Sequence, residues 1–560
     1  MDAPNLQQIL DDPTTGMAWF DSLGLSSSDA AHADLRRIAA QGIPIDLLQV
    51  VCRQMAGELP KLSDPDMALR NLERFVAASR NPLSLGTLFE RDPAALPTLL
   101  QIFSTSQYLS DLLARDPEGY DLLRMTEGAP VARDELVREL LAEVEPLSDE
   151  RDVMATLRRI KHRETMRIAY GDIVRSQALE TVTRQISYLA DALVEAAIRF
   201  AGKKVGEKRG TPLRPDGKPA RFVVLALGKL GGCELNYSSD IDLIALYDED
   251  GKTDGPRSVS NAEFYDQMTR KVVKLLGEAT DQGSVYRVDM RLRPHGSQGP
   301  LINSMRAMLQ YYDVSGRTWE RQAYVKARPI AGNLELGDEL LGHLQPWIYR
   351  RYLTLADITG IKSLKRRIER GANAKGFDQR DVKTGHGGIR DIEFVIQFLQ
   401  LVNGGTLPEV RTGNTLQAIA LLEKNKCLTP QERGILDENY RLLRKLEHRL
   451  QIMFDLQTHS LPTNRDEMRK LAIRLGYQAT PHCSALDAFE ADLASKTEDN
   501  RKILNFLLHD AFGDDAKTEP EVDLVNDPEP TPERIEAVLG KYAFADVDAA
   551  YTNLMALATD

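Results

Sequence analysis

Two aspartates lie one residue apart near the middle of the chain, in the stretch FVVLALGKLGGCELNYSSDIDLIALY, residues 222–247. Residues i and i+2 of a strand point to the same face, so Asp240 and Asp242 are expected to project together. Neighbouring carboxylates repel each other unless a positive charge lies between them. Their hard oxygen ligands favour Mg²⁺ or Mn²⁺ over zinc. The pair therefore predicts a divalent-metal site.

A third aspartate lies in SVYRVDMRLRP, residues 284–294, which alternates as a strand does. In a strand, Asp289 would share one face with Arg287, Arg291 and Arg293. A third carboxylate on a neighbouring strand would complete a site for two metal ions, which clamp the attacking and leaving oxygens of a phosphoryl displacement. The arginines would then face phosphate oxygens, to which their planar fork is well suited.

The glycine-rich segment GKLGGCE follows an apolar strand and is predicted to open a helix. Glycines let backbone N–H groups come close to a phosphate, and the start of a helix favours negative charge. A lysine in the segment could add a point charge, and two serines after it could contact phosphate oxygens or form a turn. These candidate phosphate-binding residues are Gly228, Lys229, Gly231, Gly232, Ser238 and Ser239.

Each of these signals is weak when it stands alone, because an Asp-x-Asp pair is more often a solvated edge. Asp64 and Asp66 have the same spacing, as do Asp546 and Asp548, without a strand or a glycine-rich segment beside them. The combination is more specific: a strand, a glycine-rich turn, a Ser-Ser-Asp-x-Asp strand, a helix and an Asp-bearing strand. It predicts a nucleotidyltransferase core.

The elements that must position these residues follow from the hydrophobic periodicity. Residues 1–202 are predicted as an N-terminal helical region, 203–345 as the nucleotidyltransferase domain, 346–512 as a helical bundle, and 513–560 as an acidic linker with a short helical tail. The fold is therefore expected to be mostly α, with an inserted α/β domain of the polymerase-β-like type and helical bundles flanking it.

The sequence also predicts the secondary-structure elements around the aspartates. Residues 222–227 and 240–248 read as strands, and 261–281 read as an amphipathic helix. Residues 202–220 are basic and rich in Gly and Pro, which predicts a linker or a long loop.

The composition excludes several other classes of protein. The net charge of −12 argues against a protein whose main task is to coat nucleic acid. The four cysteines lie far apart, without a Cys-x-x-Cys pair, so they are expected to be free thiols in a reducing compartment. The first residues lack a secretory signal, and no apolar run approaches 18 residues. We therefore expect a cytoplasmic location without contact to a membrane or nucleic acid.

Several long segments go beyond this general description. GKLGGCELNYSSDIDLI, RVDMRLRPHGSQGPL, WERQAYVKARPIAG, VKTGHGGIRDIEFVIQFLQL and LLRKLEHRLQIMFDLQTHSLP resemble the glutamine synthetase adenylyltransferase family and occur in the family's order from about residue 90 onward. That family's enzyme carries two related halves, each a nucleotidyltransferase domain followed by a helical bundle. One half attaches AMP from ATP to a tyrosine of glutamine synthetase, and the other removes it by phosphorolysis and releases ADP.

The resemblance covers one half only. MRLRP followed by GPL, WER with VKAR, and GGIRDIEF are most similar to the adenylyl-removing half, and the chain ends where the second half would begin. The resemblance implies glutamine synthetase, a PII signalling protein, ATP or ADP, phosphate and glutamine as partners. The favoured activity is phosphorolytic removal of AMP from the tyrosine.

The resemblance also implies roles for single residues. Asp240 and Asp242 are the metal ligands, and Asp289 is the third carboxylate, which could also orient or deprotonate the attacking group. Lys326 and Arg328, at the end of an expected strand, could bind phosphate or simply form a solvated face. Those five residues, together with Arg291, Arg293 and the glycine-rich segment, form the predicted site.

Three alternatives stay open at this point. The same core could adenylylate glutamine synthetase with ATP instead of removing AMP. It could extend an RNA, although such enzymes use basic channels and stacking aromatics, and this chain has a pI of about 5.5 and only 6% aromatic residues. Finally, the chain could be a regulatory module that binds glutamine synthetase or PII without turnover.

Overall fold

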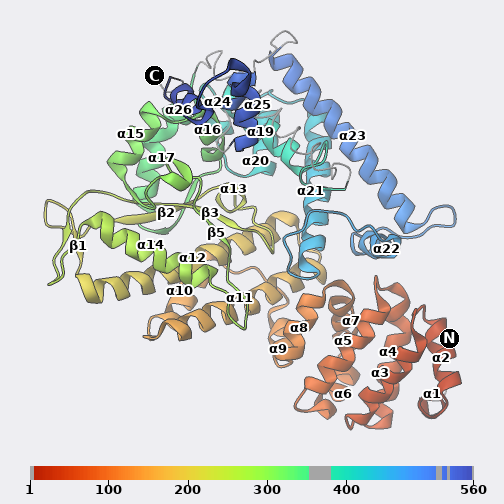
Figure 1. The fold of residues 1–560 in the computed structure, drawn as a ribbon. Coiled ribbons are helices and arrows are strands. Elements are labelled where there is room, and N and C mark those ends of the chain that lie inside the picture. The colour runs from red at the N-terminus through yellow and green to blue at the C-terminus, as the bar shows by residue number, and fades with distance from the viewer. Residues whose placement is uncertain (1–5, 352–379, 513–519, 526–529, 558–560) are drawn as a thin grey trace.

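The N-terminal part of the chain is helical, as predicted (Figure 1). The computed structural model describes residues 6–351, 380–512, 520–525 and 530–557. The N-terminal helices are α1 (Leu6–Asp11), α2 (Pro13–Ser22), α3 (Ser28–Ala40), α4 (Ile45–Glu58), α5 (Pro65–Ala78), α6 (Pro82–Arg91), α7 (Ala95–Thr105), α8 (Gln107–Arg115), α9 (Gly119–Thr126), α10 (Arg133–Val144), α11 (Glu150–Ile173) and α12 (Leu179–Arg209).

Helix α12 is longer than the sequence indicated, because it continues for 31 residues to Arg209. The predicted linker over residues 202–220 is therefore wrong in its first part, where KKVGEKR completes the last turns of the helix. Lys208 and Arg209 lie in the final turn, where positive charge stabilises the negative end of the helix dipole. Gly210 then ends the helix with a φ of 84°.

A small mixed sheet follows and contains the predicted strands. Strand β2 (Phe222–Ala226) pairs antiparallel with β3 (Ile241–Tyr247) and with β7 (Arg328–Gly332). Strand β3 also pairs in parallel with β5 (Val288–Asp289) and β6 (Asn303–Ser304), which gives the order β5-β3-β2-β7 with β6 beside the far end of β3. A separate ribbon joins β1 (Pro212–Leu213) to β4 (Lys252–Thr253).

The sheet is covered on both faces, which explains the unbroken apolar runs of its central strands. Val224 and Ala226 face a core shared with α12 and with α14 (Asn261–Gly277), whereas Val223 and Leu225 face a second core. The helices of the second core are α15 (Met305–Val314), α16 (Thr318–Tyr324) and α17 (Leu334–Ile348). The predicted amphipathic helix at 261–281 is confirmed as α14, although it ends at Gly277.

The segment predicted as a strand over residues 284–294 forms only the short β5. Turns follow directly after Asp289, and Arg293 holds this turn by donating to the carbonyl oxygens of Met290, Gly299 and Pro300 at 2.7, 3.3 and 3.1 Å. The expectation that Asp289, Arg291 and Arg293 share a strand face is therefore wrong. The Arg293 guanidinium thus binds backbone carbonyl oxygens of the turn, whereas the alternating sequence had predicted that it would face phosphate.

The C-terminal helices pack around a core of their own (Figure 1). They are α19 (Ile389–Asn403), α20 (Thr415–Lys424), α21 (Pro430–Ile452), α22 (Arg465–Arg474) and α23 (Ala485–Phe512). Helix α21 begins with a capping box, in which Thr429 and Glu432 each accept the other's backbone N–H, and Pro430 occupies the first helical position.

The tail contains more structure than an acidic linker with one short helix. Its helices are α24 (Pro520–Val525), α25 (Pro532–Leu539) and α26 (Val547–Leu557). Leu524 of α24 is fully buried against Ile535 and Leu539 of α25, so part of the predicted linker is an ordered element of a small core. The boundaries between the four predicted domains stay predictions.

Candidate active site

The structure places the three predicted aspartates on two adjacent strands. Asp240 directly precedes β3, Asp242 is its second residue, and Asp242 is the register partner of Asp289 on the parallel strand β5. Neighbouring strands lie about 4.8 Å apart, so the backbones of Asp242 and Asp289 are side by side. The prediction that a neighbouring strand carries the third carboxylate is confirmed.

At this edge of the sheet, the neighbouring charges and burial shift the pKa values of the aspartates. Burial, followed by the negative charges of Asp240 and Asp289, raises the pKa of Asp242 to about 6. Burial acts on Asp289 in the same direction, but hydrogen bonds from the side chain and backbone of Arg291 outweigh it and lower the pKa of that carboxyl. Asp242 is thus a half-buried carboxylate on which the repulsion from two other carboxylates outweighs the attraction of Lys383 and Arg291.

The side chains of the flanking aspartates are engaged with different partners. Arg291 Nη2 lies 2.7 Å from Asp289 Oδ2, and Gln457 Nε2 donates to Asp240 Oδ1 at 3.3 Å. Over the part of the chain that the structure describes, no three His, Cys, Asp or Glu side chains converge closely enough to hold a metal ion. The aspartates therefore lie on adjacent strands, but their side chains do not converge on one point in the described structure.

The glycine-rich turn packs directly against these strands. It forms α13 (Gly228–Gly231), a single turn, instead of the start of a long helix. Gly228 has a φ of +56°, and a Cβ there would lie 2.6 Å from Asp242 Oδ2. A Cβ on Gly231 would lie 1.9 Å from the carbonyl oxygen of Lys326, and one on Gly232 would lie 2.5 Å from that of Gly413. Close packing against backbone carbonyls thus requires glycine at positions 231 and 232, whereas the positive φ favours it at position 228.

Lys229, predicted to add a point charge for phosphate, points instead to helix α21. Its Nζ lies 2.7 and 2.8 Å from the two carboxylate oxygens of Glu447, which is completely buried. Burial lowers the pKa of Lys229 to about 8, and the charge of Glu447 partly offsets that shift. His459 Nδ1 lies 2.9 Å from the same carboxylate.

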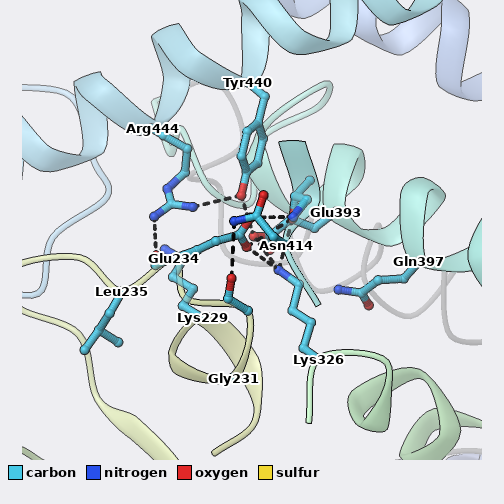
Figure 2. Close-up of polar contacts among 12 residues, drawn as sticks. Lys229, Gly231, Glu234, Leu235, Lys326, Glu393, Gln397, Asn414, Tyr440 and Arg444 are labelled. Carbon is cyan, nitrogen blue, oxygen red and sulfur yellow. Dashed lines mark hydrogen bonds and ion pairs between the residues drawn. The ribbon is translucent and has the colours of Figure 1, made fainter. Parts of the chain in front are cut away.

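Lys326 and Arg328 also lie in buried ion pairs. Lys326 Nζ contacts Glu234 at 2.8 Å, Glu393 at 3.2 Å and the Thr415 hydroxyl at 3.2 Å (Figure 2). Two nitrogens of the Arg328 guanidinium donate to the carboxylate of Asp191 at 2.7 and 3.0 Å. Neither cation lies on a solvated face, which was the alternative interpretation.

Glu393 belongs to the same network from the side of α19. Burial by itself would raise the pKa of Glu393, but Lys326 and other nearby cations hold it at about 2. Tyr440 donates to Glu393 at 3.0 Å, and Arg444 donates to the Tyr440 hydroxyl at 2.8 Å (Figure 2). This carboxylate is therefore ionised and fully paired.

Ser238 and Ser239 lie just before β3 and are largely buried. The Ser238 backbone N–H donates to Gln451 Oε1 at 3.2 Å, and its hydroxyl donates to Asp455. Both contacts come from helix α21 or the segment that follows it. The serines therefore line the junction between the sheet and the C-terminal helices.

Sequence reasoning missed the partners that helix α21 supplies. Arg444 donates to the carbonyl oxygen of Glu234 and to Asn236, and the His448 ring also contacts Asn236, at 3.0 Å. Arg449 pairs with Asp172 at 2.6 Å. The available signal was the charge content of the apolar stripe, since charged residues at helical spacing among buried leucines must find partners.

No helix in the described residues is both long and apolar enough to cross a bilayer.

Comparison with known proteins supports a family relationship. A family model described as glutamate-ammonia ligase adenylyltransferase matches residues 96–343, and one described as GlnD PII-uridylyltransferase matches residues 361–508. The first covers the aspartates and the glycine-rich turn, and the second covers α19 to α22.

Curated relatives give the same result. A bifunctional glutamine synthetase adenylyltransferase/adenylyl-removing enzyme from Pseudomonas aeruginosa is 38% identical over 410 residues, which are 72% of this chain and 41% of the relative. Proteins of the same name from Rhodopseudomonas palustris and Nitrosococcus oceani are each 37% identical, over 81% and 73% of this chain and 46% and 42% of their own lengths. The chain spans less than half the length of these relatives.

Proposed function

Because this chain belongs to the glutamate-ammonia ligase adenylyltransferase family, we propose that it is the nucleotidyltransferase that removes AMP from a tyrosine of glutamine synthetase. The observation that carries the proposal is the parallel register of Asp242 and Asp289, with Asp240 at the start of the same strand. This arrangement concentrates three carboxylates at one edge of a sheet beside a glycine-rich turn.

The donor set suits a divalent cation such as Mg²⁺ or Mn²⁺. Asp240, Asp242 and Asp289 would hold it, because they offer hard oxygen ligands and because the repulsion that raises the pKa of Asp242 would be relieved by positive charge. When bound, such a cation neutralises charge on the transferring phosphoryl group. Asp289 could take part only after giving up its contact with Arg291.

The chain's own residues then have defined tasks. Once released from Asp289, the Arg291 guanidinium can bind the phosphate that attacks the AMP phosphorus. An oxygen of hydrogen phosphate forms the new P–O bond, and the bond from the AMP phosphorus to the tyrosine oxygen breaks. The proton of the attacking phosphate passes to the tyrosine oxygen, and ADP leaves. Gly228 lets the turn approach Asp242 closely enough to shield that edge from bulk water.

The direction of the reaction rests on the motifs most similar to the removing half. The names of the relatives include both activities, so adenylylation with ATP is the alternative within the same site. The match to a PII-uridylyltransferase model over residues 361–508 supports a PII protein as a regulatory partner.

A regulatory module without turnover is the second candidate. It is favoured by one observation, namely that the three carboxylates do not converge as a ready metal site within the described residues. This candidate predicts binding of glutamine synthetase without any transfer of AMP.

One experiment separates these candidates. The purified chain is incubated with Mg²⁺ and either adenylylated glutamine synthetase plus phosphate, or unmodified glutamine synthetase plus ATP. We expect ADP release in the first mixture alone, lost in an Asp240→Asn/Asp242→Asn variant that still binds glutamine synthetase. AMP incorporation in the second mixture would show that the chain adenylylates glutamine synthetase. Binding of glutamine synthetase without ADP release or AMP incorporation would favour the regulatory module.

A further inference from the structure

A cavity of about 410 Å³ lies where helices α8 and α11 approach the segments before β3 and β5. Its wall includes Lys161 and His162 of α11, Arg115 of α8, and Tyr286 and Arg287. None of the three aspartates lines it. The cavity is thus distinct from the carboxylate edge, and its size is that of a typical small-molecule site.

Lys161 is the unusual residue of this cavity. Its side chain is only 8% exposed, and nowhere in the described ranges does a carboxylate or a hydrogen-bond acceptor pair with its Nζ. The nearest favourable contact is the ring of Tyr286, whose centroid lies 5.0 Å from Nζ. Burying an ammonium group without a partner costs free energy, so the chain retains a charge here that its own fold does not use.

The charges around Lys161 do not supply the missing partner. Burial lowers the pKa of Lys161, and Arg287 and Arg158 work in the same direction, although Asp455 opposes them. Asp455 already accepts a hydrogen bond from Ser238. Of the other carboxylates in the wall, Asp111 pairs with Arg74 at 2.6 Å and Asp281 is exposed at the rim.

The remaining cations surround the cavity's opening. Arg115 and Arg287 are both exposed, and Arg287 uses one nitrogen to donate to the carbonyl oxygen of Ser238 at 3.0 Å. His162 stacks edge-on against Tyr108, and burial followed by the charge of Lys161 lowers the pKa of His162 to about 4, so this ring is neutral. Two exposed guanidinium groups therefore lead to one buried ammonium group.

We propose that this cavity binds a small oxyanion, a carboxylate or a phosphate, with Lys161 as its central ligand. Arg115 and Arg287 attract the anion at the opening, and the buried lysine pairs with it inside, where a charge-assisted hydrogen bond is strongest. The inference does not depend on the proposed reaction, because none of the three aspartates lines the cavity and binding alone tests it. Ser238 and Ser239, which were predicted to contact phosphate, do line the cavity.

The test is a calorimetric titration of the full chain with inorganic phosphate and, separately, with succinate, without divalent metal and with a chelator present. We expect the wild type to bind at least one of them and Lys161→Met to bind about ten- to a hundredfold more weakly. The probe that binds identifies the chemistry as phosphate or carboxylate. Without ligand, Lys161→Met should melt at a higher temperature, because it removes an unpaired buried charge.

Two further variants keep the test decisive. Lys208→Met, at an exposed lysine in the last turn of α12, should bind like the wild type. It should not melt at a higher temperature, because the lost charge favours the helix dipole. Arg115→Gln, at an exposed rim position that does not threaten the fold, should weaken binding by a smaller factor. The proposal is overturned if the wild type binds neither probe, or if Lys161→Met and Arg115→Gln both bind with unchanged affinity.

Discussion

The edge of β3 and β5 that carries the three aspartates and the ionic network between the sheet and helices α19 to α21 both contain charged side chains. They differ in how those charges are balanced. In the network, Lys326 contacts Glu234 and Glu393, and Lys229 contacts Glu447, so each buried charge has an opposite partner. At the edge, Asp242 is half-buried, and the charges of two further carboxylates raise its pKa. Charges that are paired with opposite charges stabilise a fold. A group of like charges, by contrast, can be neutralised by a bound ligand.

The comparison also separates two roles that the sequence had combined. Lys229 and Lys326 were assigned to phosphate together with the glycine-rich turn, but the structure places both in contacts with α19 to α21. These contacts join the sheet to the C-terminal helices across more than 60 residues of sequence separation. The residues that form structural ion pairs therefore lie directly beside the residues that could take part in catalysis.

The largest expected effect is the loss of activity in Asp242→Asn. Removing one of three carboxylates should reduce AMP removal by roughly 10⁴-fold, equivalent to about 5.5 kcal/mol, a loss of the size seen when a key charged group is removed from phosphoryl-transfer enzymes. The melting temperature should stay equal or rise, because the change relieves repulsion. An inactive variant that also unfolds would place Asp242 in the structural network instead.

Breaking the network should act on stability in the opposite way. Glu447→Gln leaves the Lys229 ammonium buried beside a neutral amide, which should cost about 3–5 kcal/mol of the free energy of unfolding, measured by urea denaturation. Lys229→Met should cost less, because Glu447 keeps Arg444 and His459 as neighbours.

The matched control for this prediction is the exposed pair Glu58 and Lys61, whose atoms lie 3.0 Å apart. Lys61→Gln should change the free energy of unfolding by less than about 1 kcal/mol. Equal losses in Lys61→Gln and Glu447→Gln would contradict the contrast drawn between buried and exposed pairs.

Glu320 is a third kind of buried carboxylate, which is held by hydrogen bonds. It accepts from the Tyr311 hydroxyl at 3.0 Å and from the Arg317 N–H at 2.8 Å, and burial raises its pKa to about 7. Since this pKa lies above the unfolded value of 4.5, the folded state binds the proton more tightly, and that stabilisation is lost as the pH rises to about 7. Relative to Glu320→Gln, the wild type should lose at most roughly 3 kcal/mol between these pH values. Parallel pH profiles of the two proteins would refute this.

The smallest expected effect concerns Gly228. Gly228→Ala should destabilise the chain by about 1–2 kcal/mol, because alanine disfavours a φ of +56° and its Cβ would press on Asp242. Activity should fall as well, since Asp242 must move. Gly57→Ala in α4 is the control: no atom lies within 4 Å of the new Cβ in the described structure, so stability should be unchanged or slightly higher. Equal losses in both variants would show that the turn does not constrain Asp242.

Local periodicity was sufficient to predict β2, β3 and α14, because their apolar residues repeat at strand or helix spacing. The pairing of Asp242 with Asp289 could also be expected, since both strands carried carboxylates on one face. The strand after Asp289 was overestimated because alternation alone cannot distinguish a strand from a turn whose arginine side chain binds backbone carbonyls, as Arg293 does.

The ionic network could not be predicted, because its pairs depend on tertiary contacts between distant segments. Nothing near Lys229 in the sequence indicates Glu447, and nothing near Arg328 indicates Asp191. Burial decides whether a lysine beside a glycine-rich turn faces a ligand or a partner helix, and burial of such a residue is a property of the whole fold.

The most direct test of the account is to identify the product released from glutamine synthetase that carries a labelled adenylyl group on its tyrosine. The full chain is supplied with Mg²⁺ and phosphate, and the label is followed by chromatography in the wild type and in Asp242→Asn. The account predicts labelled ADP with the wild type and none with the variant. Labelled AMP would indicate hydrolysis instead of phosphorolysis, and equal ADP release by both proteins would contradict the assignment of the chemistry to the carboxylate edge.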